Sequence, residues 1–421
     1  MKRRSFFSMM AAAGLCGTSW SPGAEAGLAG GAGPMQGPYT GPFFVTFAAD
    51  GGWDPTGFCD PHANLHNGYN NDGIASAGAI KYADIGNNAA FFQRFADQLL
   101  IINGLDTSTN NHSVGRRHVW TGRQDMTHPH WAALAAGTHG PEQPLAYIGE
   151  ASQSATEGVV ARTRVSNSDV LTELSFPDKV NAANPEDLQT YHSEPAHEMI
   201  DAWRTSRLER MQQEQNLPRI DAALANLITA RSGSNELALL QSYLPETLAT
   251  NEVRRQIQIA LASYKAGIAV SATFGMNGFD THENNDAAQD SVRATLLGHV
   301  EFLWDEAERQ GIGEQIVCAI GSDFARTPEY NGINGKNHWP VTSMMLMGQG
   351  IEGNRVVGGT DSGQRALKVD PNTLALSNSG VTLTPAHVHA ALRELAGVDP
   401  SFDALFPLGI SDPISGLLGT A

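Results

Sequence analysis

Three predicted strands of the chain each run into an acidic residue. The strands span residues 43–47, 268–274 and 315–320, and the acids that follow them are Asp50, Asp280 and Asp323. In a parallel sheet the carboxyl ends of the strands lie along one edge, where ligands bind. Carboxylates gathered at one edge repel each other unless a cation lies between them. The sequence therefore predicts a metal site at this edge.

Histidines occur near two of these acids. His282 follows Asp280 by two residues, which places both side chains on one side of an extended segment. His338 follows Asp323 by fifteen residues, after a glycine-rich turn. Carboxylate oxygens and imidazole nitrogens are ligands of zinc and similar divalent metals. A lone histidine of this kind is commonly a surface residue, but beside the strand-end acids these two favour one or two divalent ions, with zinc the first candidate.

The elements that position these residues indicate an α/β fold. Apolar residues of 286–310 recur at helical spacing, and this predicted helix lies between the strands 268–274 and 315–320. A strand, helix and strand of these lengths form a right-handed crossover between parallel strands. Further helices are predicted at 89–98, 114–120 and 385–396, and further strands at 99–103 and 344–347. We expect a mostly parallel central sheet with helices on both faces.

A second helical region is predicted between residues 194 and 266. Its apolar residues, among them Met199, Trp203 and Ile257, recur at the spacing of amphipathic helices. We expect several helices here, inserted into the main domain as a cap or a side bundle. Plain scaffolding is the simplest interpretation of their role.

The first 26 residues have the composition of an export signal. A basic start with Arg3 and Arg4 precedes a short apolar run and a small-residue cleavage site, Ala24-Glu25-Ala26. The arginine pair followed by Ser5-Phe6-Phe7 indicates the twin-arginine route. An ordinary secretory signal is the alternative. We expect a protein of the periplasm or the exterior, with the twin-arginine machinery as a partner.

The remaining chain is acidic. Without residues 1–26, which hold three basic residues and one acidic residue, the formal net charge changes from −17 to −19. Residues 27–41 are rich in glycine, alanine and proline and are predicted to form a flexible linker, and residues 42–415 the folded domain. No basic stripe remains, so nucleic acid is not expected as a partner. No later apolar run reaches the ~18 residues of a membrane span, and Cys59 and Cys318 are too few for a disulfide framework.

Three motifs carry a resemblance to a known family. They are Asp280-Thr281-His282, the run from Gly321 to Pro328 (sequence GSDFARTP), and Gly335-Lys336-Asn337-His338. They resemble a bacterial family catalogued as a domain of unknown function (number 1501), grouped with the alkaline phosphatase and sulfatase superfamily. The likeness covers most of the chain and is sharpest from residue 278 to 340. It implies an alkaline phosphatase-like sandwich with a helical insertion.

The resemblance also implies a set of metal ligands. Superfamily hydrolases have two metals at the strand ends and a nucleophile at a helix N-terminus. Asp50 matches the acid of the first strand, with Asp54 a nearby second candidate. The ligands implied for one metal are Asp280, His282 and His338, and Asp323 is implied for the other.

The chain departs from the superfamily pattern next to Asp323. The superfamily usually has histidine at the next position, where this chain has Phe324, so the second metal lacks one ligand. His112 is a candidate to supply it. His112 precedes the predicted helix 114–120, whose ending Thr121-Gly122-Arg123 is similar to the sulfatase signature, and it falls at the position of the sulfatase nucleophile.

The same helix start offers further candidates. A helix N-terminus attracts anions, and Arg116 would add positive charge. Ser113 is a candidate nucleophile, although a capping role is the ordinary explanation for such a serine. A water molecule activated by the metal is the alternative nucleophile. Asn111 and Arg326 are candidate contacts for the substrate anion, and Asn111 could equally cap the helix.

These features favour a metal-dependent hydrolase of phosphate or sulfate esters. The leading alternative is a catalytically degenerate protein that binds a surface polymer or a partner in the cell envelope, which Phe324 favours. A structural envelope protein without metal is a third interpretation.

Overall fold

The computed structural model describes residues 38–419, with gaps at residues 64, 67, 70 and 126–127 and several more between 166 and 238. The predicted signal, residues 1–26, and most of the predicted linker lie outside these residues. Within the last part of that linker, Tyr39 donates its backbone N–H to the carbonyl of Gly267 at 2.9 Å and packs against Tyr264. The described chain therefore begins attached to the main body.

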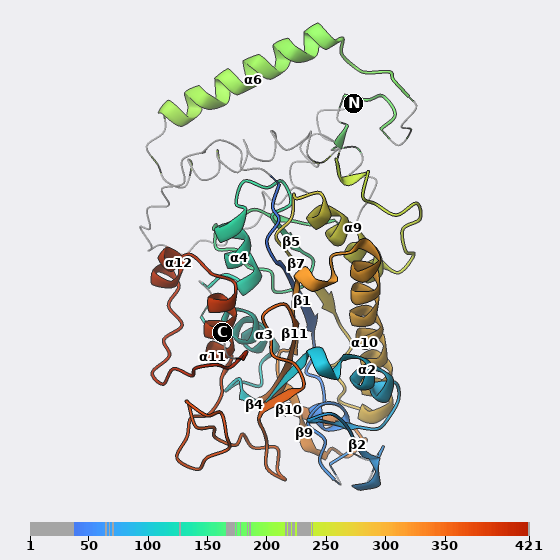
Figure 1. Ribbon diagram of the computed structural model, residues 1–421, viewed down its shortest axis with the longest axis vertical. Coiled ribbons are helices and arrows are strands. Elements are labelled where there is room, and N and C mark those ends of the chain that lie inside the picture. Colours follow the sequence, from blue (N-terminus) through green and yellow to red (C-terminus); the bar gives the residue numbers. More distant parts are fainter. Residues whose placement is uncertain are drawn as a thin grey trace.

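An eight-stranded sheet forms the centre of the molecule (Figure 1). In spatial order its strands are β12 (Arg355–Gly358), β4 (Leu99–Asp106), β11 (Val341–Gly348), β8 (Ile316–Ser322), β1 (Phe43–Ala49), β7 (Ser271–Met276), β5 (Tyr147–Gly149) and β6 (Arg162–Thr163). β11 is antiparallel to both of its neighbours, and the other pairings are parallel. The prediction of an α/β protein with a mostly parallel central sheet is confirmed.

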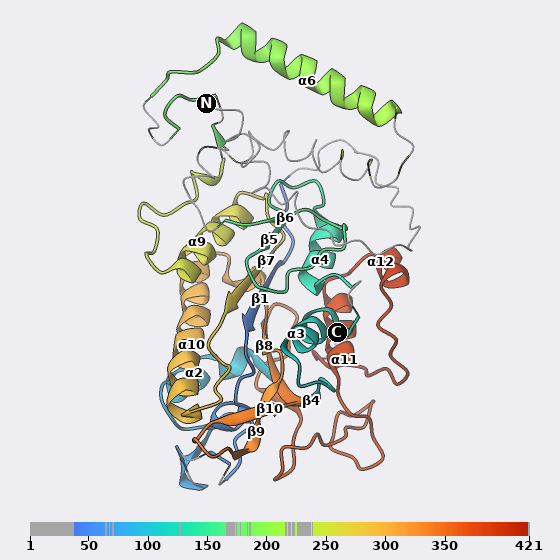
Figure 2. The ribbon, with the colours of Figure 1, turned by 180° about the vertical axis from the view of Figure 1, so that it is seen from behind.

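The side chains of β1 show why helices cover both faces of the sheet. Phe43 and Phe47 point to one face and Phe44 to the other, and all three are buried. The first face packs against α2 (Asn88–Phe95), α9 (Glu252–Lys265) and α10 (Asn285–Gln310). The second packs against α3 (His112–Thr121), α4 (Trp131–His139) and α11 (Pro385–Leu395). Figure 2 shows both layers from behind.

Three adjacent strands end at the same level. Ala49, the last residue of β1, pairs with Met276 of β7 and with Ser322 of β8. A hairpin of β9 (Ala325–Tyr330) and β10 (Lys336–Trp339) follows β8. This edge therefore brings together the segments after β1, β7 and β8.

Smaller elements complete the described chain. They are β2 (Ile74–Ala77), β3 (Ile80–Ala83), α12 (Pro400–Leu405) and the 3-10 helices η2 (Pro55–Gly57), η3 (Asn71–Gly73), η4 (Ala96–Gln98) and η5 (Gly313–Gln315). β2 and β3 form an antiparallel pair of their own.

Two helices described within the predicted helical insertion differ in their burial. α6 (Glu194–Glu214) lies at one end of the molecule and has no buried residue, with Met199 70% and Trp203 58% exposed. Its apolar residues therefore do not form a buried stripe. α9 instead packs on β7 and α10, with Ile257 buried in the core. α9 thus belongs to the main body, and α6 lies outside it.

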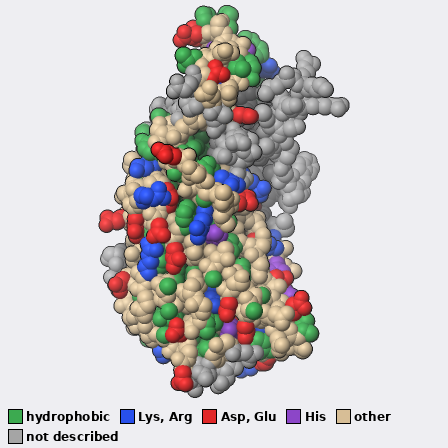
Figure 3. Space-filling model, turned by 90° about the vertical axis from the view of Figure 1, so that its right-hand side faces the viewer, with side chains coloured by type: hydrophobic (Ala, Val, Ile, Leu, Met, Phe, Trp, Pro, Cys, Tyr) green, Lys and Arg blue, Asp and Glu red, His purple; other side chains and the backbone are tan. Residues whose placement is uncertain are grey.

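One face of the molecule carries charges of both signs, and the described cysteines are not joined in a disulfide. Figure 3 shows acidic and basic side chains mixed over the face that carries α10. Cys59 and Cys318 are buried free thiols, and burial raises the pKa of each. No helix in the described part of the chain combines the length and apolar character of a membrane span.

Candidate metal centre

A carboxylate and three imidazoles converge beyond the carboxyl ends of the strands. Oδ1 of Asp280 lies 3.0 Å from Nε2 of His282 and 3.2 Å from Nε2 of His338. Oδ2 of Asp280 lies 3.4 Å from Nε2 of His112. The Nε2 atoms of His282 and His338 are 3.0 Å apart. We call these four residues the metal-ligand cluster.

The spacing of these atoms suits a divalent ion. Ligand atoms ~2.0–2.2 Å from a tetrahedral zinc ion lie roughly 3.3–3.6 Å from one another. Donor atoms of His112, Asp280 and His338 all lie within 4.8 Å of each other. His282 approaches two of these three and is the most exposed of the three histidines in the cluster, with 47% of its side chain accessible. Among the described residues this is the one group of donors with such a spacing.

In His338 and His112, Nδ1 points away from the cluster and is held by a hydrogen-bond acceptor. The Nε2 atom of each ring can then direct its lone pair into the cluster. Nδ1 of His338 lies 2.8 Å from the carbonyl oxygen of Asn110, and because a carbonyl only accepts, this Nδ1 carries the proton. Nδ1 of His112 lies 2.6 Å from Oδ2 of Asp323. Nε2 of His112 is buried and has no hydrogen-bond partner within the described structure. Such outer contacts orient histidine ligands in metal sites, so the donors fit a metal.

Arg326 holds the carboxylate of Asp280. Burial opposes the ionisation of Asp280, but the hydrogen bond and charge of Arg326 outweigh it and lower the pKa of Asp280 to about 2. Arg326 itself is fully buried, and its guanidinium also donates to the carbonyls of Gly51, Gly52 and Lys336. These contacts correct the prediction that Arg326 binds substrate, because the side chain is enclosed and already engaged.

Asp323 and Asp50 lie at the edge as predicted but have other partners. Both oxygens of Asp323 are engaged, Oδ1 with the N–H of Gly51 at 3.0 Å and Oδ2 with His112. Asp50 accepts from the hydroxyl of Ser152 at 2.6 Å and lies 3.8 Å from the Arg116 guanidinium. Burial raises the pKa of Asp50. These carboxylates flank the cluster, and the described residues fit one ion there.

Asp54 is not part of the cluster. Its carboxylate is fully buried and lies 2.8 Å from the ammonium of Lys336. It also accepts from the side chain of Asn285 at 2.9 Å. The predicted role of Asp54 as a metal ligand is therefore replaced by a buried ion pair, because the residues after β1 turn inward at this point.

The N-terminus of α3 positions His112 and three other predicted residues. Asn111 caps the helix by accepting from the N–H of Val114 at 3.1 Å, so the capping alternative holds for it. Ser113 is exposed in the first turn. The helix packs closely on the end of β8, since a Cβ at Gly115 would lie 2.4 Å from the carbonyl oxygen of Asp323.

Phe324 and Ser152 have contacts at the site that the sequence did not predict. Phe324 is fully buried, and its ring centroid lies 4.7 Å from that of His112 and 4.5 Å from that of His338. It therefore packs against two ligands. Ser152 follows β5, a strand of three residues. That strand is too short to be recognised by alternation, so its end was not assigned to the edge.

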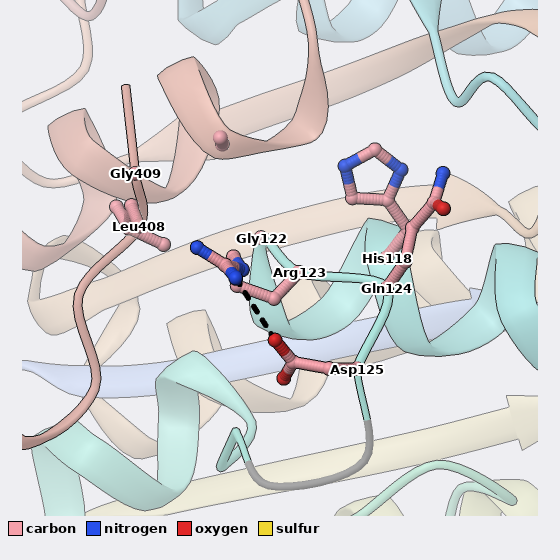
Figure 4. Close-up of a pocket in the computed structure, with 8 residues that line it drawn as sticks. His118, Gly122, Arg123, Gln124, Asp125, Leu408 and Gly409 are labelled. Carbon is pink, nitrogen blue, oxygen red and sulfur yellow. Dashed lines mark hydrogen bonds and ion pairs between the residues drawn. The ribbon is translucent and has the colours of Figure 1, made fainter. Parts of the chain in front are cut away.

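A shallow pocket lies at the opposite end of α3 (Figure 4). It is lined by His118, Gly122, Arg123, Gln124, Asp125, Ala386, Leu408 and Gly409. Arg123 and Asp125 form an ion pair at 2.9 Å in its wall. The pocket is formed at the C-terminus of α3, whereas His112 lies at the N-terminus, so it is separate from the metal-ligand cluster.

Comparisons with known proteins point to one family. The model of a family described as "Protein of unknown function (DUF1501)" matches residues 48–400. No curated protein matches the sequence.

Solved structures similar to the chain include sulfatases and an alkaline phosphatase. The PsFucS1 sulfatase from Pseudoalteromonas sp. is 11% identical, with 90% of this chain and 72% of that chain covered and a TM-score of 0.38. The lipoteichoic acid synthase LtaP from Listeria monocytogenes is 8% identical, with 90% and 74% covered and a TM-score of 0.37. A variant of TAB5 alkaline phosphatase is 8% identical, with 86% and 100% covered and a TM-score of 0.35. With TM-scores below 0.5, these similarities support no conclusion about the activity of this chain.

Proposed function

The chain belongs to the DUF1501 family, and from the geometry of its site we propose that it is a metal-dependent hydrolase of phosphate or sulfate esters. The observation that carries the proposal is the convergence of Asp280, His112, His282 and His338 at distances of 3.0–3.4 Å. The outer nitrogens of His112 and His338 are held by other acceptors. A divalent cation between these atoms would be bound by the carboxylate of Asp280 and by the nitrogens that His112 and His338 turn toward it.

The surroundings of the cluster favour an anionic substrate. A divalent cation held here would polarise an ester and lower the pKa of a water molecule. Arg116 lies beside Asp50 with 28% of its side chain exposed, and it projects from the first turns of α3. A helix N-terminus together with a guanidinium attracts an anionic group such as a phosphate or sulfate.

Ser113 is the candidate side-chain nucleophile. It is exposed in the first turn of α3, next to His112. Attack by its hydroxyl and attack by a water molecule are distinguished by replacing it. Turnover that is lost in Ser113→Ala assigns the attack to the side chain, and turnover that is retained assigns it to water.

The proposal is tested with the purified full-length chain. We expect bound zinc or another divalent metal, and turnover of an aryl phosphate or an aryl sulfate. Asp280→Asn and His338→Ala should lose both the ion and the turnover. Arg116→Met should keep the ion and raise KM. Full metal occupancy in both ligand variants would defeat the assignment.

Phe324 favours one second candidate function, a protein that binds a surface polymer without cleaving it. An apolar ring occupies the position after Asp323, and that carboxylate is already engaged. A protein that holds the ion and binds an anionic polymer but turns over no aryl phosphate, sulfate or phosphonate would favour this candidate.

We also propose that the chain is exported by the twin-arginine route to the periplasm or the exterior, on the evidence of residues 1–26 alone. Replacing Arg3 and Arg4 by lysine should keep the protein in the cytoplasm. Cell fractionation measures this, and unchanged export in that variant would indicate another route.

A further inference from the structure

A buried ion pair lies behind the metal-ligand cluster. The ammonium of Lys336 and the carboxylate of Asp54 are 2.8 Å apart, and 0% of either side chain is exposed. The ammonium also donates to the hydroxyl of Thr56 at 3.3 Å and to the carbonyl of Leu65 at 2.8 Å. Because both partners are enclosed and fully engaged, neither can touch a substrate.

The backbone of Lys336 joins the segments that carry the ligands. Its N–H donates at 3.2 Å to the carbonyl of Thr281, which lies inside the segment 280–282. Its carbonyl accepts at 3.2 Å from Arg326, the residue that holds Asp280. His338 follows two positions later in β10. A shift of Lys336 would therefore move every ligand except His112.

Asp54 reaches the same segment from the other side. Its N–H donates to Oε1 of Gln289 at 3.0 Å, and its carboxylate accepts from Nδ2 of Asn285 at 2.9 Å. Gln289 in turn donates to the hydroxyl of Thr281 at 3.0 Å, and that hydroxyl donates to Asn285 at 2.6 Å. Both members of the ion pair are thus connected to Thr281 through buried hydrogen bonds.

The fold alone does not require charges at these two positions. Well-packed apolar residues commonly replace a buried ion pair with little loss of stability, because desolvation of the charges offsets their attraction. What such a pair supplies is a fixed separation and direction. We propose that Lys336 and Asp54 are a positioning pair that sets the spacing of Asp280, His282 and His338, and thereby the affinity and coordination geometry of the bound ion. The inference rests on the proposed metal centre.

A double substitution tests this role. Removing one charge would leave the other buried and unpaired, so both are replaced in Asp54→Leu/Lys336→Met, which keeps a similar volume. We expect this full-length variant to fold cooperatively but to bind Zn²⁺ about tenfold more weakly or worse, as when outer contacts of metal ligands are lost. The visible absorption of bound Co²⁺ should change in intensity, because it reports coordination geometry. Affinity and spectrum equal to wild type in the folded variant would overturn the proposal.

A control removes another ion pair with one buried partner, which no described hydrogen bond or ion pair joins to the cluster. Arg393 is buried in α11 and pairs with Asp403 at 3.0 Å. The double variant Arg393→Met/Asp403→Leu should change the melting temperature and leave Zn²⁺ affinity and the Co²⁺ spectrum unchanged. A loss of affinity equal to that of the test variant would mean that general destabilisation causes the effect, and would also overturn the proposal.

A second variant keeps the test decisive if the double variant does not fold. Asn285→Ala leaves the ion pair intact but removes the link that joins the carboxylate of Asp54 to Thr281 through Asn285, while the backbone link through Gln289 remains. It should weaken Zn²⁺ binding and shift the Co²⁺ spectrum in the same direction, and unchanged values would again overturn the proposal. Zn²⁺ binding by the wild-type chain tests the metal centre itself. If the wild-type chain binds no ion, the proposed metal centre is wrong, and this result is distinct from any effect of the variants.

Discussion

At the scale of single residues, the two nitrogens of one imidazole have different tasks. Nδ1 of His112 faces the buried carboxylate of Asp323 at 2.6 Å, and Nε2 faces Asp280 at 3.4 Å. Because the carboxylate of Asp323 accepts a hydrogen bond from Nδ1–H, the lone pair of Nε2 is directed toward the cluster. The hydrogen bond and charge of Asp323 also raise the pKa of His112. In the proposed metal centre Asp323 would therefore act on the ion through His112.

Replacing Asp323 tests this indirect role. In Asp323→Asn the side chain keeps its shape but loses its charge and part of its hold on the imidazole. We expect metal affinity to fall by roughly 10–100-fold, measured by competition with a chelator. Asp50→Asn is the control, since Asp50 contacts Ser152 and Arg116 rather than a ligand. Equal losses in both variants would contradict the assignment.

His299 in α10 gives a prediction about pH that does not involve the site. It is 4% exposed, and burial, followed by the charge of Arg254, lowers its pKa to about 4. The unfolded chain has a histidine pKa near ~6.5 and so takes up the proton first. The contribution of neutral His299 to the free energy of unfolding is therefore complete above pH ~6.5. It is lost as the pH falls from there toward 4, by at most about 3 kcal/mol.

Urea unfolding of His299→Leu between pH 7 and pH 4 checks this expectation. The variant should lose less stability than wild type over this range. If both chains show the same slope, His299 is not the group responsible. Equal m-values in the two chains establish that the same unfolding transition is compared.

At the scale of elements, the close packing of α3 on β8 sets the position of His112. The contact depends on Gly115, where a Cβ would lie 2.4 Å from the carbonyl oxygen of Asp323 and 3.1 Å from the ring of Phe324. Backbone cannot yield as a flexible side chain does. Any larger residue at this position must therefore push the helix, and His112 with it, away from the edge.

The variant Gly115→Ala should both destabilise the protein and weaken the metal site. Overpacking of this kind costs about 1–3 kcal/mol. Gly298→Ala in α10 is the matched control, because its Cβ would meet only the Arg254 side chain at 3.7 Å. There alanine should stabilise by roughly 0.5–1 kcal/mol. Thermal melts and chelator competition measure both effects, and a Gly115→Ala protein as stable as wild type would contradict the packing argument.

At the scale of the whole molecule, charge balance around the cluster favours one ion. Three carboxylates gather at the edge, but Arg326 pairs with Asp280, and Arg116 lies beside Asp50. Asp323 is engaged with His112. Arg326 and Arg116 thus balance part of the negative charge that a second ion would otherwise neutralise.

Elemental analysis of the purified chain should accordingly give one divalent ion per molecule. Two ions per molecule would contradict this reasoning. Removal of the ion by a chelator should lower the melting temperature, because a ligand present at a hundredfold excess over its Kd stabilises by about 2.7 kcal/mol. A chelator without effect on the melt would mean that the folded chain holds no ion.

The sequence was sufficient for the five longest strands of the sheet and for part of the site. The strands that precede Asp50, Asp280 and Asp323 can be recognised in the sequence, because buried parallel strands form continuous apolar runs. The inward turn of Asp54 was not predictable, since its partner Lys336 is 282 residues away. The buried position of Arg326 was missed for the same reason, because its partners are backbone carbonyls that only the folded chain brings near.

For the helices, too, the sequence predicted some features and not others. The apolar stripe of α10 was predicted, and Leu296, Val300 and Leu303 are buried as expected. Met199 and Trp203 have the same helical spacing in α6 but are exposed. Spacing identifies a helix, whereas burial depends on whether another element covers its apolar side.

The four donors come from three separate stretches of chain, around residues 112, 280 and 338. Contacts of such long sequence separation are slow to form, because closing each loop costs chain entropy before any contact compensates for it. A nascent or truncated chain would offer only isolated imidazoles and carboxylates, with the weak affinity of free side chains. Loading of the ion would thus be the last event in maturation, and retention of the ion would report that the tertiary structure is complete.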